Sequence, residues 1–552
     1  MKEQLNKMSK ILFSASVIGW IIIGVLLFNV VNVDASNSED ANIYKKLKLF
    51  SEALFNVRQN YVEELDVDDL IDSAIKGMLD EVDPHTTYFT PDEFDKFSTD
   101  TKGEFGGLGI SIDKKGEYIT VVAPIEGTPA YRLGIMAGDK ISKVDGESVV
   151  GVSTDESISK MRGEPGTEVT ISIIRPGVEE ELDFEITREI IKIHSIPYSF
   201  KLDNGIGYMR IRQFNANTTS DMREKLDELE EEGIKGLVID LRFNPGGLLR
   251  EAINTVNEFI GKGKLVVFTK GRAPQTNMEY LTRYNRIRDD YPVIVLINSG
   301  SASASEIFAG SLQDWDRGLV VGQTSFGKGS VQRLFPLSDG NGIKITTAKY
   351  YIKSGRCIHK DLNDKLMKDE RVKNGEISKE EIEEMKEEAD IKNHENIYYT
   401  NKGRKVYGGG GITPDIEIKQ SLLTDLGVDL RRKNVFFNYS VDYLLDHEDK
   451  IALDYLASEK DIKNLLKFAE GEEIEFEQVD ADSIYDWLQN ELTSNVIGRK
   501  FGEVERYKVI LREDTQLQET LDIFEKYPTL EEMYKYAEET AQKKEEKIED
   551  NE

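Results

Sequence analysis

The strongest architectural signal in the chain is a buried strand that joins a helix through a turn of small residues, within residues 291–332. Val293 to Ile297 form a short apolar run rich in β-branched residues, which is typical of a buried strand. The small residues Ser299 to Ser305 follow, and from Ala304 onward apolar side chains recur at helical spacing. The free N–H groups and the positive dipole end of such a helix favour a negatively charged oxygen at the turn. The segment therefore predicts an α/β domain with a site for an oxyanion.

The turn contains serines, which are candidate nucleophiles but need a base to become reactive. Lys328 is the nearby candidate, since it lies between Phe326-Gly327 and Gly329, where a desolvated ammonium can approach a serine. Burial lowers the pKa of a lysine until its neutral amine can accept a proton. The five histidines of the chain all lie outside this segment: His85, His194, His359, His394 and His447. The pattern therefore favours a serine–lysine pair over a serine–histidine pair.

Two other interpretations of the same residues remain open. The turn could be only a helix N-cap, because Glu306 would complete a capping box with Ser303. Residues 322–328, GQTSFGK, also match the phosphate-loop pattern GxxxxGK after an apolar strand. Position 329 is Gly where that pattern requires Ser or Thr, and residues 331–335 have the pattern of a strand. Nucleotide binding is therefore disfavoured.

Residues 299–314, SGSASASEIFAGSLQD, and 320–332, VVGQTSFGKGSVQ, resemble the two active-site blocks of the carboxy-terminal processing proteases, serine–lysine peptidases of family S41. The resemblance implies a multidomain α/β protein with a crotonase-like protease core, an inserted PDZ domain, a helical N-terminal segment and a helical C-terminal extension. It assigns the nucleophile to Ser303, the general base to Lys328 and the residue that orients the lysine to Gln332. Asp314 lies eleven residues after Ser303, about three helical turns, so it shares a face of the helix with the serine end; we expect a structural or supporting role, with a direct catalytic role as the alternative.

Residues 244–247, Asn-Pro-Gly-Gly, follow the buried-strand pattern of Leu237 to Leu241. By the same resemblance, a backbone N–H of one of these glycines and that of Ala304 form the oxyanion hole. The sequence does not decide between Gly246 and Gly247, and we assign Gly247. A simple glycine turn is the alternative.

Residues 101–190 alternate short strands with turns and resemble a PDZ domain that begins with a GLGI-type loop. Its glycines allow backbone N–H groups to converge on a terminal carboxylate, and the edge strand beyond can pair with an extended peptide. Arg162 is expected at the surface or at a domain contact. The predicted peptide-binding residues are Gly107, Leu108, Gly109, Ile110, Ile158 and Met161.

Residues 11–33 are uncharged and mostly apolar, and they are long enough to span a hydrocarbon core as one helix. Lysines precede them and acidic residues follow, so residues 1–10 are expected in the cytoplasm and the rest outside it. A cleaved signal peptide is the alternative. Both interpretations place the catalytic part in a periplasm or on the outer side of the cell membrane.

The remaining boundaries follow from pattern and charge. Residues 40–100 have helical spacing and end in DPHTTYF, which resembles an LDPHS-type segment of the same family, so that a structural role is expected for His85. The protease core is expected at 195–420 with a charged insertion at 358–406. A helical region at 421–535 and a disordered tail at 536–552 complete the prediction.

Composition limits the remaining possibilities. The chain has 102 acidic and 71 basic residues, a balance that disfavours nucleic-acid binding. Cys357 is the single cysteine, so a disulfide within the chain and a metal–thiolate cluster are excluded, and no metal or other cofactor is predicted. The sequence thus predicts a membrane-anchored serine endopeptidase that binds protein or peptide substrates through their C termini and cleaves them near those tails. A homo-oligomer is compatible with this prediction, and a catalytically inactive PDZ scaffold is the alternative function.

Overall fold

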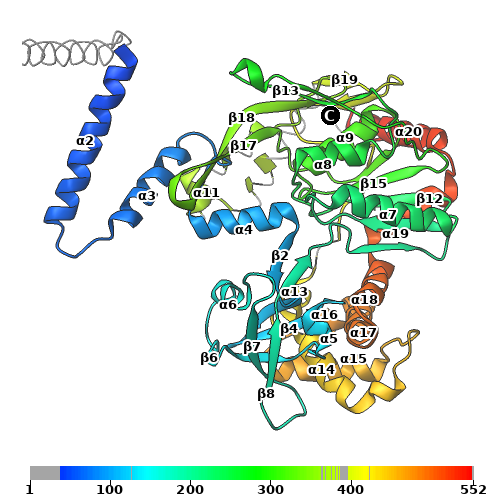
Figure 1. Cartoon of the computed structure of the whole chain (residues 1–552). Helices are drawn as coiled ribbons and strands as arrows, with labels where there is room; N and C mark the ends of the chain where they lie inside the picture. Colours follow the sequence, from blue (N-terminus) through cyan, green and yellow to red (C-terminus); the bar gives the residue numbers. More distant parts are fainter. Residues whose placement is uncertain are drawn as a thin grey trace, which may run out of the picture. The chain divides into compact units, whose positions relative to one another are not determined.

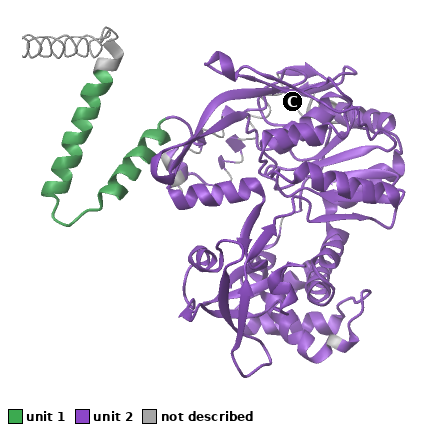
Figure 2. Cartoon of the chain, in the orientation of Figure 1, with its two compact units in different colours: residues 1–81 green, residues 82–552 purple. Residues whose placement is uncertain are grey.

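The computed structural model describes residues 38–549 except for short gaps at 126, 362–364, 367–368, 375, 379–380, 383, 386–395 and 422. The chain divides into two units, residues 1–81 and 82–552, which are coloured separately in Figure 2. In the first unit the described helices are α2 (Ser38–Asn60) and α3 (Val67–Asp80), as predicted for this segment. Within the described residues, no helix combines the length and the apolar character that a membrane span needs. The predicted anchor at 11–33 lies outside these residues.

A six-stranded sheet forms the centre of the second unit. β10 runs antiparallel to β11, and the other neighbours run parallel. The two middle strands are buried on both faces, which explains their continuous apolar runs. In the order of the sheet, the strands are β10 (Tyr198–Lys201), β11 (Ile206–Arg210), β12 (Gly236–Asp240), β15 (Val293–Ile297), β16 (Leu319–Gly322) and β21 (Ile416–Glu417).

Helices cover both faces of this sheet (Figure 1). One face packs against α7 (Thr218–Glu231), α8 (Leu249–Val256) and α9 (Ala304–Asp314). The other packs against α19 (Thr515–Lys526) and α20 (Leu530–Glu549). Side chains alternate between the two cores along each strand, as Leu237 and Val238 do on β12.

The C-terminal prediction needs one correction, which concerns the tail. The described part of residues 421–535 is mostly helical, as predicted, and α19 and α20 belong to the core of the central sheet. The tail predicted to be disordered from 536 is helical to Glu549, and Ala537 is buried against the sheet. The helices that do form a separate C-terminal core are α13 (Asp425–Arg432), α14 (Val435–His447), α15 (Glu459–Gly471), α16 (Gln478–Ser483), α17 (Tyr485–Phe501) and α18 (Glu503–Ile510).

A second sheet lies around the long strand β18 (Gly342–Ile352). β17 (Ser330–Pro336) pairs along one edge of β18, while β1 (Thr87–Phe89) and β13 (Leu265–Lys270) pair with different parts of its other edge. β14 (Glu279–Leu281) continues the sheet beyond β13. Helix α4 (Pro91–Lys102) follows β1 and starts with a capping box between Thr90 and Glu93.

The predicted PDZ domain has its own sheet and core. A ribbon of β2 (Glu104–Gly107) and β9 (Glu189–Lys192) joins its two ends to the rest of the second unit. The sheet contains β3 (Ile110–Lys115), β4 (Tyr118–Pro124), β5 (Lys140–Val144), β6 (Glu147–Ser148), β7 (Glu168–Ile174) and β8 (Leu182–Thr187), with the helices α5 (Pro129–Arg132) and α6 (Thr154–Met161).

The PDZ domain also contacts the separate C-terminal helical core. The Arg499 guanidinium donates to the Ala137 carbonyl at 3.3 Å, and the Lys115 ammonium lies 2.8 Å from the centre of the Phe437 ring. In the charged insertion the described elements are α11 (Glu370–Lys373) and the hairpin of β19 (Ile397–Tyr399) and β20 (Lys405–Tyr407). Parts of the predicted insertion, residues 386–395 among them, lie outside the described residues.

Candidate active site

Ser303 lies in the turn between β15 and α9, with the backbone in a strained conformation. Its φ is +57° and its ψ is −112°, a combination that side-chain-bearing residues rarely adopt. Ser301 holds this turn in place. Its hydroxyl donates to the Leu241 carbonyl at 2.8 Å and accepts the Asn298 N–H at 3.0 Å. Strain at an over-determined turn is typical of a functional position.

One buried carboxylate, that of Glu306, joins the predicted nucleophile to the predicted base. It accepts the backbone N–H of Ser303 at 2.7 Å and that of Lys328 at 2.9 Å. It also accepts the N–H of Gly327 at 2.7 Å and the hydroxyl of Ser325 at 2.5 Å. Burial raises the pKa of Glu306 to about 7, although all four donors act to lower it. The N-cap interpretation therefore names a real contact, but the same carboxylate also fixes the loop that carries Lys328.

The Lys328 loop is enclosed by two later segments. The Lys360 N–H donates to the Gly327 carbonyl at 2.8 Å, and the Ile412 N–H donates to the Ser325 hydroxyl at 2.7 Å. A Cβ atom at Gly329 would lie 2.6 Å from the His359 nitrogen, so no side chain fits there. The Ser or Thr of a phosphate loop is thereby excluded, and β17 follows where that motif requires a helix.

Tyr350 is a site residue that sequence reasoning missed. Its hydroxyl donates to the Lys328 carbonyl and is hydrogen-bonded to the side chain of Ser303. Burial raises the pKa of Tyr350 well above its usual value, and the nearby Glu306 charge adds to this. The phenol is therefore a permanent neutral donor. The only local signal is an aromatic residue on a predicted strand, which is equally typical of any core.

Gln332 lies on β17 within a polar cluster that reaches β1. Its amide nitrogen donates to the Ser330 hydroxyl at 2.8 Å and to the Thr346 hydroxyl at 3.3 Å. Thr346 in turn donates to Asp83 at 3.2 Å. Burial alone would raise the pKa of Asp83, but hydrogen bonds from His85, Thr86 and Thr346 outweigh it and lower that pKa. The DPHT segment is thus attached to the strand beside Gln332, and His85 contributes its backbone N–H.

The predicted oxyanion turn lies directly against Ser303. A Cβ atom at Gly246 would lie 2.7 Å from the Ser303 Cβ and 2.8 Å from the Ala304 nitrogen, and one at Gly247 would lie 2.1 Å from the Phe214 carbonyl oxygen. Both positions also have positive φ, so both require glycine. The Gly246 N–H donates to the Asn244 side chain at 2.9 Å. Among the described residues, no acceptor is hydrogen-bonded to the Gly247 N–H.

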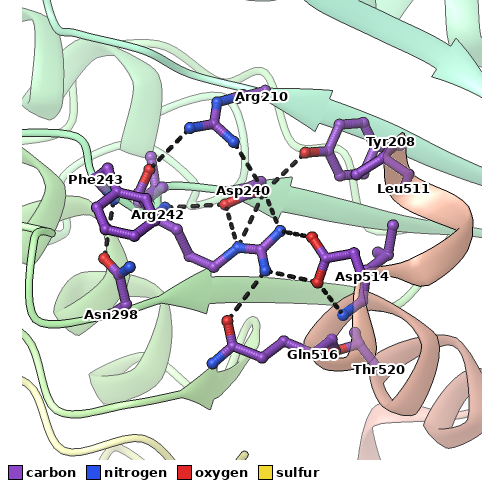
Figure 3. A network of polar contacts seen from close by, with 12 residues as sticks. Tyr208, Arg210, Asp240, Arg242, Phe243, Asn298, Leu511, Asp514, Gln516 and Thr520 are labelled. Carbon is purple, nitrogen blue, oxygen red and sulfur yellow. Dashed lines mark hydrogen bonds and ion pairs between the residues drawn. The ribbon is translucent and has the colours of Figure 1, made fainter. Parts of the chain in front are cut away.

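A buried ionic network fixes the other end of this turn, as Figure 3 shows. Arg242 donates to Asp240 at 2.7 Å and to Asp514 at 2.6 and 2.9 Å. Burial alone would raise the pKa of Asp240, but the charges of Arg242 and Arg210 outweigh it and hold that pKa below its usual range. The start of α19 is thereby tied to the end of β12. The side chain of Asp240 is also a hydrogen-bond acceptor for Tyr208, at 2.7 Å.

Asp314 is not brought to Ser303, so the structure favours the structural role over the alternative of a direct catalytic role. It occupies the last position of α9, so the helix places it about 16 Å from the serine end. There its carboxylate forms a fully buried ion pair with Arg356 at 3.0 Å and accepts the Ser354 N–H at 2.7 Å. Its role is to hold the end of the helix against the strand turn that follows β18.

The PDZ domain carries an apolar cavity of about 70 Å³ between β3 and α6. All six predicted peptide-binding residues line it: Gly107, Leu108, Gly109, Ile110, Ile158 and Met161. Phe105, Ile112 and Arg162 line it as well, and the Arg162 guanidinium lies 4.4 Å from the centre of the Phe105 ring. Arg162, which was expected at the surface or at a domain contact, thus also borders this cavity.

Comparison with known proteins gives matches over most of the chain. Peptidase family S41 matches residues 205–369, the PDZ domain family matches 106–186, and the family "Activating protease CtpB N-terminal domain" matches 27–92. The chain is 42% identical over 327 residues to a carboxy-terminal-processing protease of Bartonella bacilliformis, covering 58% of this chain and 75% of the relative. It is 35% identical to the carboxy-terminal processing protease CtpA of Bacillus subtilis, covering 57% and 67% respectively. Among solved structures, a photosystem II D1 C-terminal processing protease is 31% identical, with a TM-score of 0.33 and coverage of 55% and 83%.

Proposed function

The chain belongs to peptidase family S41, the serine peptidases that include the carboxy-terminal processing proteases, and on this premise we propose that Ser303 and Lys328 together hydrolyse peptide bonds. The observation that carries the proposal is the position of Glu306, whose carboxylate accepts the N–H groups of both residues. A single rigid group thus sets the spacing between nucleophile and base. Such preorganisation is what general-base catalysis by a side chain requires.

In the proposed reaction, the neutral amine of Lys328 accepts the proton of the Ser303 hydroxyl as its oxygen attacks the peptide carbonyl. The N–H groups of Gly247 and Ala304 donate to the developing oxyanion. The Lys328 ammonium then gives its proton to the leaving amine, and the peptide bond breaks to leave an acyl-serine. Water, activated by the same lysine, releases the acyl group and restores Ser303.

Two neighbours support this assignment. The Tyr350 hydroxyl donates to the Lys328 carbonyl and is hydrogen-bonded to the Ser303 side chain, so one phenol contacts both residues. Its raised pKa keeps this phenol neutral. Gln332, with its amide held by Ser330 and Thr346, is proposed to orient the lysine side chain from β17.

The test is cleavage of an unstructured protein with an apolar C terminus by the full-length chain. Ser303→Ala and Lys328→Ala are each expected to lower kcat/KM by at least about 10²- to 10⁴-fold, since base and nucleophile act in one step. Ser299→Ala, an exposed serine of the same turn, is the matched control and should cleave like the wild type. Cleavage by Lys328→Ala at the wild-type rate would contradict the proposed base.

We further propose that the PDZ cavity holds the C-terminal residue of the substrate. Its apolar lining and small volume suit one aliphatic side chain, while the backbone of residues 107–109 faces the carboxylate. A fluorescent peptide ending in a free carboxylate should bind, and its C-terminal amide should bind at least about tenfold more weakly. Ile158→Asp should abolish the difference. Binding without cleavage would favour the inactive-scaffold alternative.

The site of action is proposed to be outside the cytoplasm. The apolar residues 11–33, preceded by lysines and followed by acidic residues, support export of the remaining chain. Protease added to intact cells whose outer membrane or cell wall has been removed should degrade the part of the protein that carries Ser303. Protection under these conditions would contradict the proposal.

A further inference from the structure

Asp83 is a half-buried carboxylate that joins the DPHT segment to β18. Its Oδ1 atom accepts the N–H groups of His85 and Thr86, each at 2.8 Å, and its Oδ2 atom accepts the Thr86 hydroxyl at 2.9 Å. Oδ1 also accepts the hydroxyl of Thr346 at 3.2 Å. The Thr86 hydroxyl in turn accepts the Thr346 N–H at 3.2 Å. Two independent contacts therefore hold Thr346 beside this carboxylate.

Strand register places Thr346 directly opposite Gln332 of β17. The preceding residue of β17, Val331, pairs with Ala348, so Thr347 is an extra residue of β18 at this point. Side chains of directly opposed residues in antiparallel strands lie on the same face of the sheet. The Gln332 amide nitrogen accordingly donates to the Thr346 hydroxyl at 3.3 Å. One hydroxyl thus lies between the Asp83 carboxylate and the Gln332 amide.

The Thr346 hydroxyl has a single proton, and Asp83 determines its direction. An ionised carboxylate only accepts hydrogen bonds, so the hydroxyl donates its proton to Asp83 and can only accept from Gln332. The part of the amide that faces Thr346 must then be the NH2 group, because the amide oxygen has no proton to donate. Burial alone would raise the pKa of Asp83, but its hydrogen bonds outweigh burial and lower that pKa, so the carboxylate is ionised at neutral pH.

The second contact of the Gln332 amide agrees with this orientation. Its nitrogen also donates to the buried Ser330 hydroxyl at 2.8 Å, so both N–H groups of the amide are used. Within the described part of the chain, no donor is hydrogen-bonded to the amide oxygen. This oxygen is therefore the acceptor that Gln332 offers to Lys328, which precedes it by four residues.

We propose that Asp83 is a positioning residue for catalysis, which fixes the Gln332 amide through the Thr346 hydroxyl and so presents the amide oxygen to Lys328. The proposal rests on the proposed function, in which Gln332 orients the base. An N–H of the Lys328 amine donates to this oxygen, which leaves the lone pair of the amine to accept the Ser303 proton. Without the carboxylate, the Thr346 hydroxyl can donate to the amide oxygen instead. The amide can then turn over and direct its NH2 group, a donor, towards the lysine.

The first test removes the hydroxyl that links Asp83 to Gln332. Thr346→Val keeps the shape of the side chain and should lower kcat of the full-length protein about three- to thirtyfold. KM should change little, because contacts with the substrate remain. Thr346→Ser restores the hydroxyl and should cleave at close to the wild-type rate. Equal losses in the two variants, or a loss confined to KM, would overturn the proposal.

Thr347→Val is the matched control. Thr347 is the next residue of β18, and its hydroxyl donates to the Val331 carbonyl at 3.3 Å, so this variant removes a hydrogen bond between the same two strands. Its kcat should stay at the wild-type value. A loss as large as that of Thr346→Val would overturn the proposal, because any weakening of the strand pair would then have the same effect.

A double-mutant cycle distinguishes failure of this proposal from failure of the proposed function. Gln332→Leu should lower kcat, and adding Thr346→Val to it should cause no further loss, since the hydroxyl acts only through the amide. Additive losses would overturn the proposal. A wild-type kcat for Gln332→Leu would instead overturn the proposed role of Gln332 itself.

Asp83→Asn tests the carboxylate directly. Asparagine keeps an acceptor for the N–H groups of His85 and Thr86, but its NH2 group can donate, so the direction of the Thr346 proton is no longer fixed. We expect a lower kcat, and no further loss when Asp83→Asn is added to Thr346→Val. If Asp83→Asn does not fold, Asp83→Ser replaces it in the same comparison, because serine forms the same kind of turn. A full loss from the Asp83 variant in the Thr346→Val background would overturn the proposal.

Discussion

The turn at residues 241–247 and the loop at residues 325–329 both lie against Ser303, but they are held by different forces. The first is fixed by guanidinium–carboxylate contacts that reach Asp514, 272 residues away from Arg242. The second is fixed by Glu306, which accepts only hydroxyl and backbone N–H donors. The turn proposed to form the oxyanion hole thus depends on the C-terminal segment, while the loop of the proposed base depends on the helix that begins after Ser303.

The pKa values of the two carboxylates at these positions shift in opposite directions because their neighbours differ. Both Asp240 and Glu306 are fully buried. Asp240 faces two guanidinium groups and its pKa is lowered, whereas Glu306 faces neutral donors and its pKa is raised to about 7. Burial disfavours the charged form of both groups, and at Asp240 the opposite charges of two arginines outweigh that penalty.

The largest expected effect tests the buried ion pairs of Arg242. Asp240→Ala should lower the free energy of unfolding by about 3–5 kcal/mol, because it leaves Arg242 buried with only the partly exposed Asp514. Urea denaturation of the full-length protein measures it. Asp227→Ala is the control, since Asp227 also contacts two arginines but is half exposed, and it should lose at most about 1 kcal/mol. Equal losses would mean that burial does not distinguish these pairs.

The next largest effect tests the role of Glu306 through the pH dependence of kcat/KM. Glu306→Gln replaces one acceptor by an amide and should cost about 1–3 kcal/mol, or roughly ten- to a hundredfold in kcat/KM. Because the pKa of Glu306 is raised to about 7, the wild-type group is protonated below that pH and already resembles glutamine. The ratio of wild-type to variant kcat/KM should therefore grow as the pH rises through about 7.

The pH dependence of the free energy of unfolding has the opposite sign at Glu306 from that of most carboxylates, whose pKa is lowered by folding. The folded protein holds the Glu306 proton more tightly than the unfolded chain, so this group's contribution is complete at low pH and is lost as the pH rises through about 7. Glu251→Gln is the control, another buried glutamate that accepts the Thr219 N–H at 3.1 Å. A Glu306→Gln activity ratio that does not change with pH would contradict the assignment.

A smaller effect separates charge from helix capping at Asp514. Its carboxylate both pairs with Arg242 and caps α19 by accepting the Leu517 N–H at 3.1 Å. Asp514→Asn keeps the cap, because asparagine is an equally good N-cap, and removes only the charge. We expect a loss of about 1–2 kcal/mol in unfolding free energy, discounted for partial exposure, with a several-fold lower kcat. An unchanged kcat would show that the charge of Asp514 does not affect the turn at residues 241–247.

The smallest effect concerns strain in the first turn. Phe243 has φ +58° and is 59% exposed, so a bulky residue occupies a left-handed conformation without burying its ring. Phe243→Gly should raise the free energy of unfolding by up to about 1 kcal/mol through relief of this strain. Phe243→Ala removes the same ring but keeps the strain, and it should not be more stable than the wild type. Equal stability of the two variants would show that the backbone is not strained.

The contrast between the two anchors also explains what sequence could predict. The residue pattern alone predicts a serine in the small-residue turn with Lys328 as its base, whereas the choice of Ser303 and of the 244–247 turn comes from the family resemblance. Glu306 is visible as a capping residue, but its bond to the Lys328 N–H joins residues 22 positions apart and leaves no local pattern. Tyr350 and Asp514 act through contacts that only the assembled sheets create.

The features that the sequence did not reveal have the same origin. Helical spacing places Asp314 on the helix of Ser303 but does not reveal that it pairs with Arg356 at the far end. The charged composition after residue 536 predicts disorder, yet Met533, Tyr534 and Ala537 bury one face of α20 against the sheet. Composition averages over a segment, whereas packing is decided by a few side chains on one face.

The most direct test of the serine–lysine pair is covalent labelling of the active-site serine. The full-length protein is treated with a fluorophosphonate. Mass spectrometry then identifies the labelled peptide and measures the rate of labelling in wild type, Ser303→Ala and Lys328→Ala. The account predicts labelling at Ser303 alone, and labelling of Lys328→Ala at least about a hundredfold more slowly, because the base is lost. Labelling of another serine, or of Ser303 at an equal rate without Lys328, would contradict it.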